Sequence, residues 1–157
     1  MKRLLLVPIV LLAASCTSGG GDSAQSSAQP GHGSITIQIV PNPIVAQHLS
    51  GSMYSFPFDA VVRETGGRPV NITRVSADVN ALGGIHVASE SYEAARISSL
   101  GYSTQLAANG ELRYHFAPQK AVADERLFSS VSAVLRVDAL DDTGTPASAQ
   151  TAVTVTR

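Results

Sequence analysis

The chain has 157 residues, a length that fits one domain of ordinary size. The chain has eleven lysines and arginines and twelve aspartates and glutamates, so its formal net charge is −1. No basic excess points to nucleic acid. Hydrophobic residues make up 44% of the chain and tryptophan is absent. Because Val, Thr, Ser and Ala are plentiful, this composition favours strands over long helices.

The first sixteen residues have the layout of an export signal. Lys2 and Arg3 provide a positive start, residues 4–12 form an apolar run, and small residues precede Cys16. The run is too short to cross a bilayer as a helix, which needs about 20 apolar residues. We therefore predict a signal peptide over residues 1–15.

Leu12 to Cys16 resembles the lipobox of bacterial lipoproteins, although Ala13 stands where the leucine is usual. The resemblance implies that the Cys16 thiol carries a diacylglycerol and anchors the chain to a membrane. It also implies a bacterial cell envelope location, in the outer membrane, because Thr17 replaces the aspartate that marks inner-membrane retention. The alternative is an ordinary secretory signal that contains a cysteine.

Residues 17–34 are rich in Ser, Gly, Ala and Gln and show no apolar periodicity. Such a segment cannot bury a core, so we predict that the lipidated cysteine and a flexible, disordered tether occupy residues 16–34. The folded domain is then expected over residues 35–157. It contains no cysteine, so it has no internal disulfide and depends on apolar burial.

The C-terminal part of the domain predicts a hairpin. Apolar residues alternate with polar ones from Val131 to Ala139 and again from Ala149 to Val155. The Asp-Asp-Thr-Gly-Thr-Pro segment between them is a strong turn signal, and Gly144 is expected to have a positive φ. A hairpin with one apolar face is not stable alone, so a second layer must cover it.

The same alternation predicts strands upstream, with these apolar positions: Ile35, Ile37 and Ile39; Phe56, Phe58, Ala60 and Val62; Val70 to Val79; Leu112, Tyr114 and Phe116. Pro57 is expected at a sheet edge or bulge. A shift of the apolar phase near Thr73 predicts a β-bulge. Residues 91–97 fit a helical turn, an irregular strand or a loop, and residues 118–126 fit a short helical turn.

Six or seven short strands with Gly, Asp and Pro turns predict an all-β, antiparallel two-sheet sandwich. Residues 61–67 and 70–75 resemble the second and third strands of bacterial immunoglobulin-like domains, and the Asp141–Gly144 turn before a Thr/Val-rich strand is typical of them. The resemblance implies an immunoglobulin-like sandwich of about seven strands. It concerns architecture only and implies no activity.

No catalytic or metal-binding pattern is evident in the sequence, and we expect no catalytic residue, no metal site and no cofactor. The histidines lack the spacing of metal ligands and no nucleophile elbow or phosphate loop is present. Three aspartates near the last turn could supply oxygens to calcium, but turns use aspartate for backbone reasons. Three glutamates could be imagined as acid/base groups, although nothing in the sequence places them together. The residues considered are His32, His48, His86 and His115; Asp138, Asp141 and Asp142; Glu90, Glu93 and Glu111.

Tyr54, Tyr92 and Tyr102 lie near the ends of predicted segments and are the candidates for an exposed contact patch. We interpret the chain as a non-enzymatic envelope lipoprotein whose domain is an interaction or structural module. Its expected partners are the membrane, through Cys16, and another envelope protein, but not nucleic acid. The alternatives are a module that binds carbohydrate or peptidoglycan fragments, and an accessory subunit of an envelope enzyme.

Overall fold

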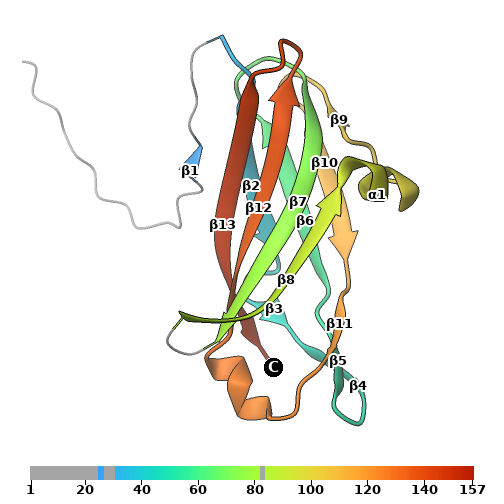
Figure 1. Cartoon of the computed structure of the whole chain (residues 1–157), viewed down its shortest axis with the longest axis vertical. Coiled ribbons are helices and arrows are strands. Elements are labelled where there is room, and N and C mark those ends of the chain that lie inside the picture. The colour runs from blue at the N-terminus through green and yellow to red at the C-terminus, as the bar shows by residue number, and fades with distance from the viewer. Residues whose placement is uncertain (1–24, 27–30, 82–83) are drawn as a thin grey trace, which may run out of the picture.

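The computed structural model describes residues 25–26, 31–81 and 84–157, which form a sandwich of two β layers (Figure 1). The predicted signal peptide and Cys16 lie outside the described residues, as does most of the predicted tether. Within the described part, no helix has the length and apolar character that crossing a membrane requires.

The first layer is a seven-stranded sheet in the order β1-β13-β12-β7-β8, with β3 also paired to β13 and β9 to β7. Its pairs are antiparallel except for the parallel pair of β3 and β13. The strands are β1 (Gln25–Ser26), β3 (Ile44–Val45), β7 (Val70–Ala81), β8 (Ile85–Glu93), β9 (Gln105–Leu106), β12 (Ser132–Asp141) and β13 (Pro146–Thr156).

The second layer consists of two three-stranded sheets, ordered β10-β6-β2 and β11-β5-β4. Their strands are β2 (Ile35–Val40), β4 (Gln47–Ser50), β5 (Met53–Ser55), β6 (Phe58–Glu64), β10 (Glu111–Phe116) and β11 (Gln119–Ala121).

The β6–β10 ladder continues into the β5–β11 ladder without a change of register. Phe58 lies opposite Phe116, the Phe56 amide donates to the Pro118 carbonyl at 3.0 Å, and β5 then pairs with β11. Pro57 therefore lies at a break within a central strand. The expectation of an edge or bulge at this proline is wrong: the register is the same on both sides of Pro57, and its missing N–H falls at the break between β5 and β6, within neither strand.

The C-terminal hairpin is confirmed. β12 and β13 pair in register, with Leu135 opposite Thr151. The inward residues of β12 are buried, and those of β13 are buried or half-buried. Gly144 has a φ of +84°, in the region that L-residues rarely adopt, as the turn signal predicted.

The bulge predicted near Thr73 is also confirmed. Along β12, Asp138 pairs with Arg74 and Ala139 pairs with Ile72, so Thr73 is the extra residue of β7. Its hydroxyl donates to the Asp138 carbonyl at 3.0 Å. The bulge keeps Ile72 and Val75 both buried although they are three residues apart.

Residues 85–100 form a strand and a helix. The strand β8 is followed by α1 (Ala94–Ser99), so of the three alternatives for residues 91–97 the helical turn is the nearest. A 3-10 helix, Glu125–Ser129, lies at the end of the segment where a short helical turn was predicted. The strand β11 precedes it and was not predicted.

The core lies between the layers, and a small second cluster around Ala46, Tyr54 and Phe128 closes one end. In immunoglobulin domains, strands A, B and E of one sheet face strands C, F and G of the other. Here β2, β6 and β10 face β7, β12 and β13, with β8 added beside β7. The chain is therefore an all-β, immunoglobulin-like antiparallel sandwich with seven longer strands, as predicted.

Candidate functional site: an apolar cleft between the layers

An apolar cavity of about 420 Å³ lies between the two layers. One wall is formed by β7, with Val75, Ala77 and Val79, and the facing wall includes Phe58 and Phe116. The volume falls within the range of about 300–1,000 Å³ that is typical of small-molecule sites. We call this cavity the inter-sheet cleft.

The cleft is open because one side of the sandwich lacks a strand. Constant-type immunoglobulin domains place a fourth strand, D, beside strand E. In this chain the segment between β8 and β10 forms α1 and β9 instead, and β9 pairs with β7. Among the described residues, no strand therefore lies beside the free edge of β10 and β11.

The helix α1 covers only part of this open side. Its residue Ile97 is buried against the core, with 1% of its surface exposed. Figure 1 shows α1 beside the upper part of β8, whereas β11 and β5 lie lower along the molecule. Two residues that line the cleft are exposed apolar residues: Val87 is 54% exposed and Leu127 44%.

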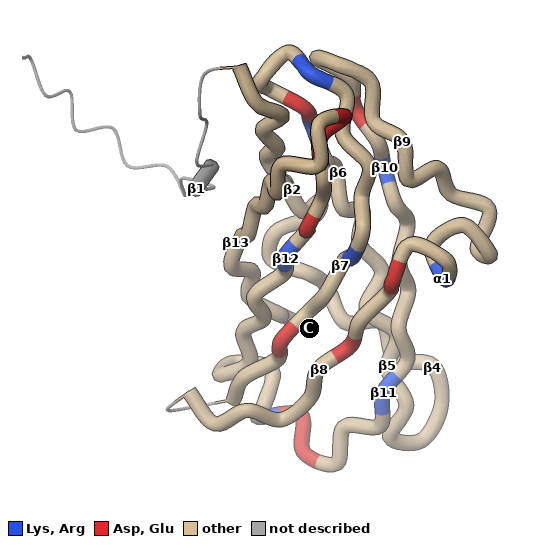
Figure 2. The backbone as a smooth tube through the Cα atoms, turned by 45° about the horizontal axis from the view of Figure 1, so that its top comes forward, with Lys and Arg blue, Asp and Glu red and all other residues tan. Residues whose placement is uncertain are grey.

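An ion pair spans the mouth of the cleft. Lys120 on β11 lies 2.7 Å from Glu90 on β8, two strands that do not pair with each other. The hydrogen bond from Lys120 lowers the pKa of Glu90, and the charge of Arg96 contributes in the same direction. The Arg96 guanidinium lies 4.3 Å from the centre of the Tyr92 ring. Figure 2 shows basic positions on α1 and β11 beside acidic positions of β8.

The side chains that line the cleft suit the binding of an apolar ligand. Among its lining residues, only Ser76, Glu90, Tyr92 and Lys120 have polar side-chain groups. In the described part of the chain, no three His, Cys, Asp or Glu side chains come together as metal ligands would. The cleft can hold an apolar group and place a charged group at its mouth.

The three tyrosines predicted as contact residues do not form one patch. Tyr54 is only 2% exposed and packs on Phe128 in the small cluster, so the expectation that it is an exposed contact residue is wrong. Tyr92 is half-buried and lines the cleft. Tyr102 is half-buried, and its hydroxyl donates to the His115 carbonyl at 3.0 Å.

The acidic residues considered in the sequence have separate structural partners. Asp138 pairs with Arg74 and Arg136, and Asp142 pairs with Arg68. The three glutamates do not meet either, because Glu90 contacts Lys120, Glu93 contacts Ser91 and Glu111 contacts Arg63.

The four histidines also lie apart. His48 bonds to the Gly51 carbonyl at 2.9 Å, and His86 lies 3.8 Å from Asp78. The ring of His115 is 2.8 Å from Asp59, and His32 lies 3.7 Å from Asp141.

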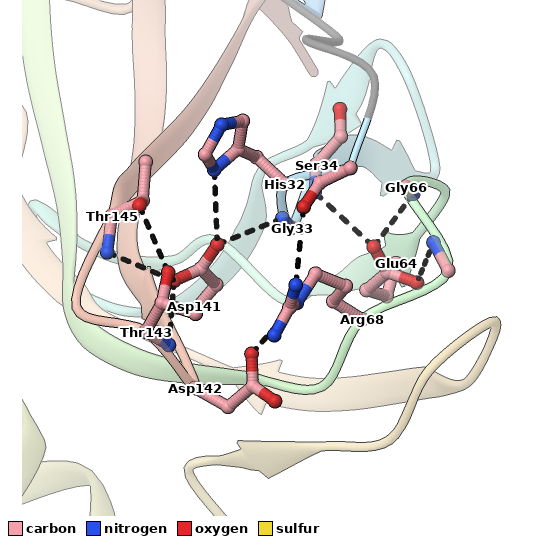
Figure 3. A network of polar contacts seen from close by, with 12 residues as sticks. His32, Gly33, Ser34, Glu64, Gly66, Arg68, Asp141, Asp142, Thr143 and Thr145 are labelled. Carbon is pink, nitrogen blue, oxygen red and sulfur yellow. Dashed lines mark hydrogen bonds and ion pairs between the residues drawn. The ribbon is translucent and has the colours of Figure 1, made fainter.

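A polar network lies at the end of the sandwich that carries the β12–β13 turn (Figure 3). The Asp141 carboxylate accepts hydrogen bonds from the backbone amides of Gly33, Thr143 and Thr145. A hydrogen bond from the Thr143 hydroxyl, at 2.6 Å, is the largest influence on Asp141. Together these donors outweigh the effect of burial and hold the pKa of Asp141 well below its ordinary value.

Glu64, at the end of β6, also accepts hydrogen bonds from several backbone amides. Burial acts to raise the pKa of Glu64, but four backbone amides outweigh it and lower the pKa. The donors are the amides of Asn109, Ser34, Gly66 and Gly67, at 2.6–3.1 Å.

The network corrects the predicted end of the tether. Gly33 and Ser34 fall within the predicted tether, but both are buried and their amides are held by Asp141 and Glu64. Local composition could not show this, because the acceptors lie 108 and 30 residues further along the chain.

Comparison with known proteins supports the fold. No protein-family model matches the sequence, and a search of curated proteins finds no match. Among solved structures, the X-ray structure of Northeast Structural Genomics Consortium target SoR45 aligns with a TM-score of 0.53 and 8% identity, over 82% of this chain and 90% of that one. Target BeR40 from Bordetella pertussis aligns with a TM-score of 0.55 and 14% identity, over 83% of this chain and 98% of that one.

A third structure, the CARDB domain of the PF1109 protein from Pyrococcus furiosus in complex with di-metal ions, has a TM-score of 0.40 and 14% identity, over 83% of this chain and 95% of that one. At that TM-score it carries no argument about this chain. The first two likenesses concern the fold alone, because their identities are low. The class that fold and site define is an immunoglobulin-like domain with an open apolar cleft between its sheets.

Proposed function

We propose that this chain is a non-enzymatic binding module of the bacterial cell envelope, held at a membrane by a lipid on Cys16. The inter-sheet cleft is its binding site, and the ligand or partner is another component of the envelope. One observation carries the proposal: an apolar cavity of about 420 Å³ opens at the side of the sandwich beneath exposed apolar residues.

The walls of the cleft disfavour the carbohydrate alternative. A sugar or peptidoglycan fragment carries many hydroxyl and amide groups, and each costs free energy when it is buried without a hydrogen-bond partner. Only four residues that line the cleft have polar side-chain groups, and two of them, Glu90 and Lys120, are paired with each other. An apolar ligand loses no hydrogen bonds on entering it.

Site-specific photo-crosslinking in living cells tests the proposal. A photoreactive amino acid replaces Val87 on the cleft rim, and a second variant carries it in place of Gln38, an exposed residue of β2 in the other layer. The proposal expects a light-dependent adduct from position 87 and none from position 38. No adduct from position 87, or equal adducts from both, would contradict it.

The anchor has its own test. Metabolic labelling with a radioactive fatty acid should label the wild-type chain and leave Cys16→Ser unlabelled, because Cys16 is the only thiol. An unlabelled wild-type chain in a bacterium that processes lipoproteins would remove the anchor from the proposal.

A further inference from the structure

The dimensions of the cleft point to an elongated ligand. Its lining follows β7 from Val75 to Ala81, six residue steps or about 20 Å at 3.3 Å per residue. Half of a bilayer's hydrocarbon core, the depth that one lipid tail spans, is about 15 Å. The cleft is therefore long enough for an extended acyl chain.

The width of the cleft points to a single chain. The open side lies beside β10 and β11, which are edge strands with no further strand paired to their free edge among the described residues. The phenylalanines Phe58 and Phe116 lie on the far wall with their ring centres 5.4 Å apart, so that wall is filled. A cavity of about 420 Å³ drawn out along this length is narrow, which suits one unbranched chain.

The charges at the mouth complement an anion. Lys120 brings a positive charge to the cleft mouth and Glu90 a negative one, and the Arg96 guanidinium lies close by, 4.3 Å from the ring centre of the cleft-lining Tyr92. The side chain of Lys120 is 52% exposed, and that of Glu90 36%. An exposed ion pair of this kind contributes little to stability, so an anionic head group can compete for Lys120.

We propose that the cleft binds a free single-chain amphiphile with an anionic head group, a long-chain carboxylate, with its chain along β7 and its carboxylate at Lys120 and Arg96. This inference rests on the proposed function and names the ligand class of the same site. Apolar side chains line the path of the chain, and the cations at the mouth take the head group.

A calorimetric titration with saturated carboxylates tests the ligand class. It uses the full chain carrying Cys16→Ser, which has no thiol to acylate. Octanoate, decanoate, dodecanoate and tetradecanoate are compared below their micelle concentrations. Each added methylene should tighten binding roughly three- to fourfold until the cavity is full. No binding by any of the four, an affinity independent of chain length, or binding of the protein only to phosphatidylglycerol vesicles would overturn the proposal.

Variants locate the bound chain. Ala77→Leu and Ala88→Leu each fill part of the cleft, and Ala95→Leu places the same side chain on the exposed face of α1. Dodecanoate affinity should fall at least about tenfold in each cleft variant that keeps the wild-type circular dichroism spectrum, and stay unchanged in Ala95→Leu. Equal affinities of the cleft variants and Ala95→Leu would overturn the proposal.

A head-group comparison completes the test. Lys120→Gln should weaken dodecanoate binding about two- to fivefold and leave dodecanol binding unchanged. Equal weakening of both ligands would overturn the role of Lys120. If no carboxylate binds but the photo-crosslink at Val87 persists, the cleft remains the binding site and only the ligand class is wrong.

Discussion

At the scale of single residues, two buried carboxylates connect the N-terminal segment to the turns at one end of the sandwich. Asp141 is 6% exposed and Glu64 is 3% exposed, and their acceptor oxygens are satisfied by backbone amides. A buried carboxylate is costly unless it is hydrogen-bonded, and here backbone amides supply the hydrogen bonds. The aspartates of the last turn thus have a structural role that requires no cation.

Asp141 should make stability depend on pH. Its folded pKa lies below the ordinary value of 3.8, so its contribution is fully present above that pH and is lost as the pH falls through the folded pKa. Asp141→Asn places an NH2 group where amides donate and should lower the melting temperature at pH 7. The difference from the wild type should shrink as the pH falls below about 3.8.

Asp142→Asn is the matched control. Asp142 lies in the same turn but is exposed and contacts only the exposed Arg68 side chain, so its substitution should change the melting temperature little. Thermal unfolding followed by circular dichroism between pH 2.5 and pH 7 measures both variants. A pH-independent loss in Asp141→Asn, or equal losses in the two variants at pH 7, would contradict the assigned role.

At the scale of elements, strands with one buried face could be predicted and the others could not. Apolar and polar residues alternate along β2, β10, β12 and β13, and buried and exposed side chains alternate in the same way. The strand β8 lies at the edge of its sheet and has no fully buried residue, so its sequence carries no clear alternation. The strand β11 is three residues long, all of them exposed, and gives no signal either.

The candidate site was less predictable than the fold. The alternation predicted Phe56, Phe58 and Phe116 as inward-facing, and they do pack in or against the core. The sequence did not show that the same three residues also line a cleft. Tyr92 was a candidate contact residue and also lines the cleft. The opening itself results from a strand that does not form between β8 and β10, and Lys120 meets Glu90 across 30 residues of sequence. No local sequence pattern predicts either the missing strand or the contact between Lys120 and Glu90.

The inward face of β12 should contribute strongly to stability. Leu135 is 2% exposed at the centre of the sheet, and Leu135→Ala should reduce the free energy of unfolding by about 2–5 kcal/mol. Leu140→Ala on the same strand is the control, because Leu140 is 41% exposed and should change the free energy by less than about 0.5 kcal/mol. Denaturant unfolding measures both, and equal midpoints would mean that the inward face of β12 is assigned wrongly.

At the scale of the whole molecule, the site and the N-terminal attachment lie at different ends. The segment before β2 joins the sandwich near the β12–β13 turn, at the top of Figure 1, whereas β11 and β5 lie toward the bottom. If residue 16 carries the anchor, the tethered end and the cleft are separate, and a ligand can reach the cleft without passing the attachment point.

The attachment segment should itself stabilise the fold. A chain that begins at Gly31 keeps the amides of Gly33 and Ser34 on their carboxylates, whereas a chain that begins at Ile35 leaves Asp141 and Glu64 with fewer donors. The shorter chain should therefore melt at a lower temperature at pH 7. Differential scanning calorimetry of the two chains tests this, and identical melting temperatures would show that these contacts contribute nothing.

The central claim is that the two layers leave an accessible apolar cavity between β8 and β11. Methyl NMR spectroscopy of the full chain under xenon pressure tests it most directly, because xenon enters apolar cavities. We predict large, saturable shifts for the methyl groups of Ala77, Val79 and Leu135, which line the cleft, and none for Ile35 and Ile72, which are fully buried away from it. Shifts at Ala77, Val79 and Leu135 no larger than those at Ile35 and Ile72 would show that the layers close against each other and would contradict the account.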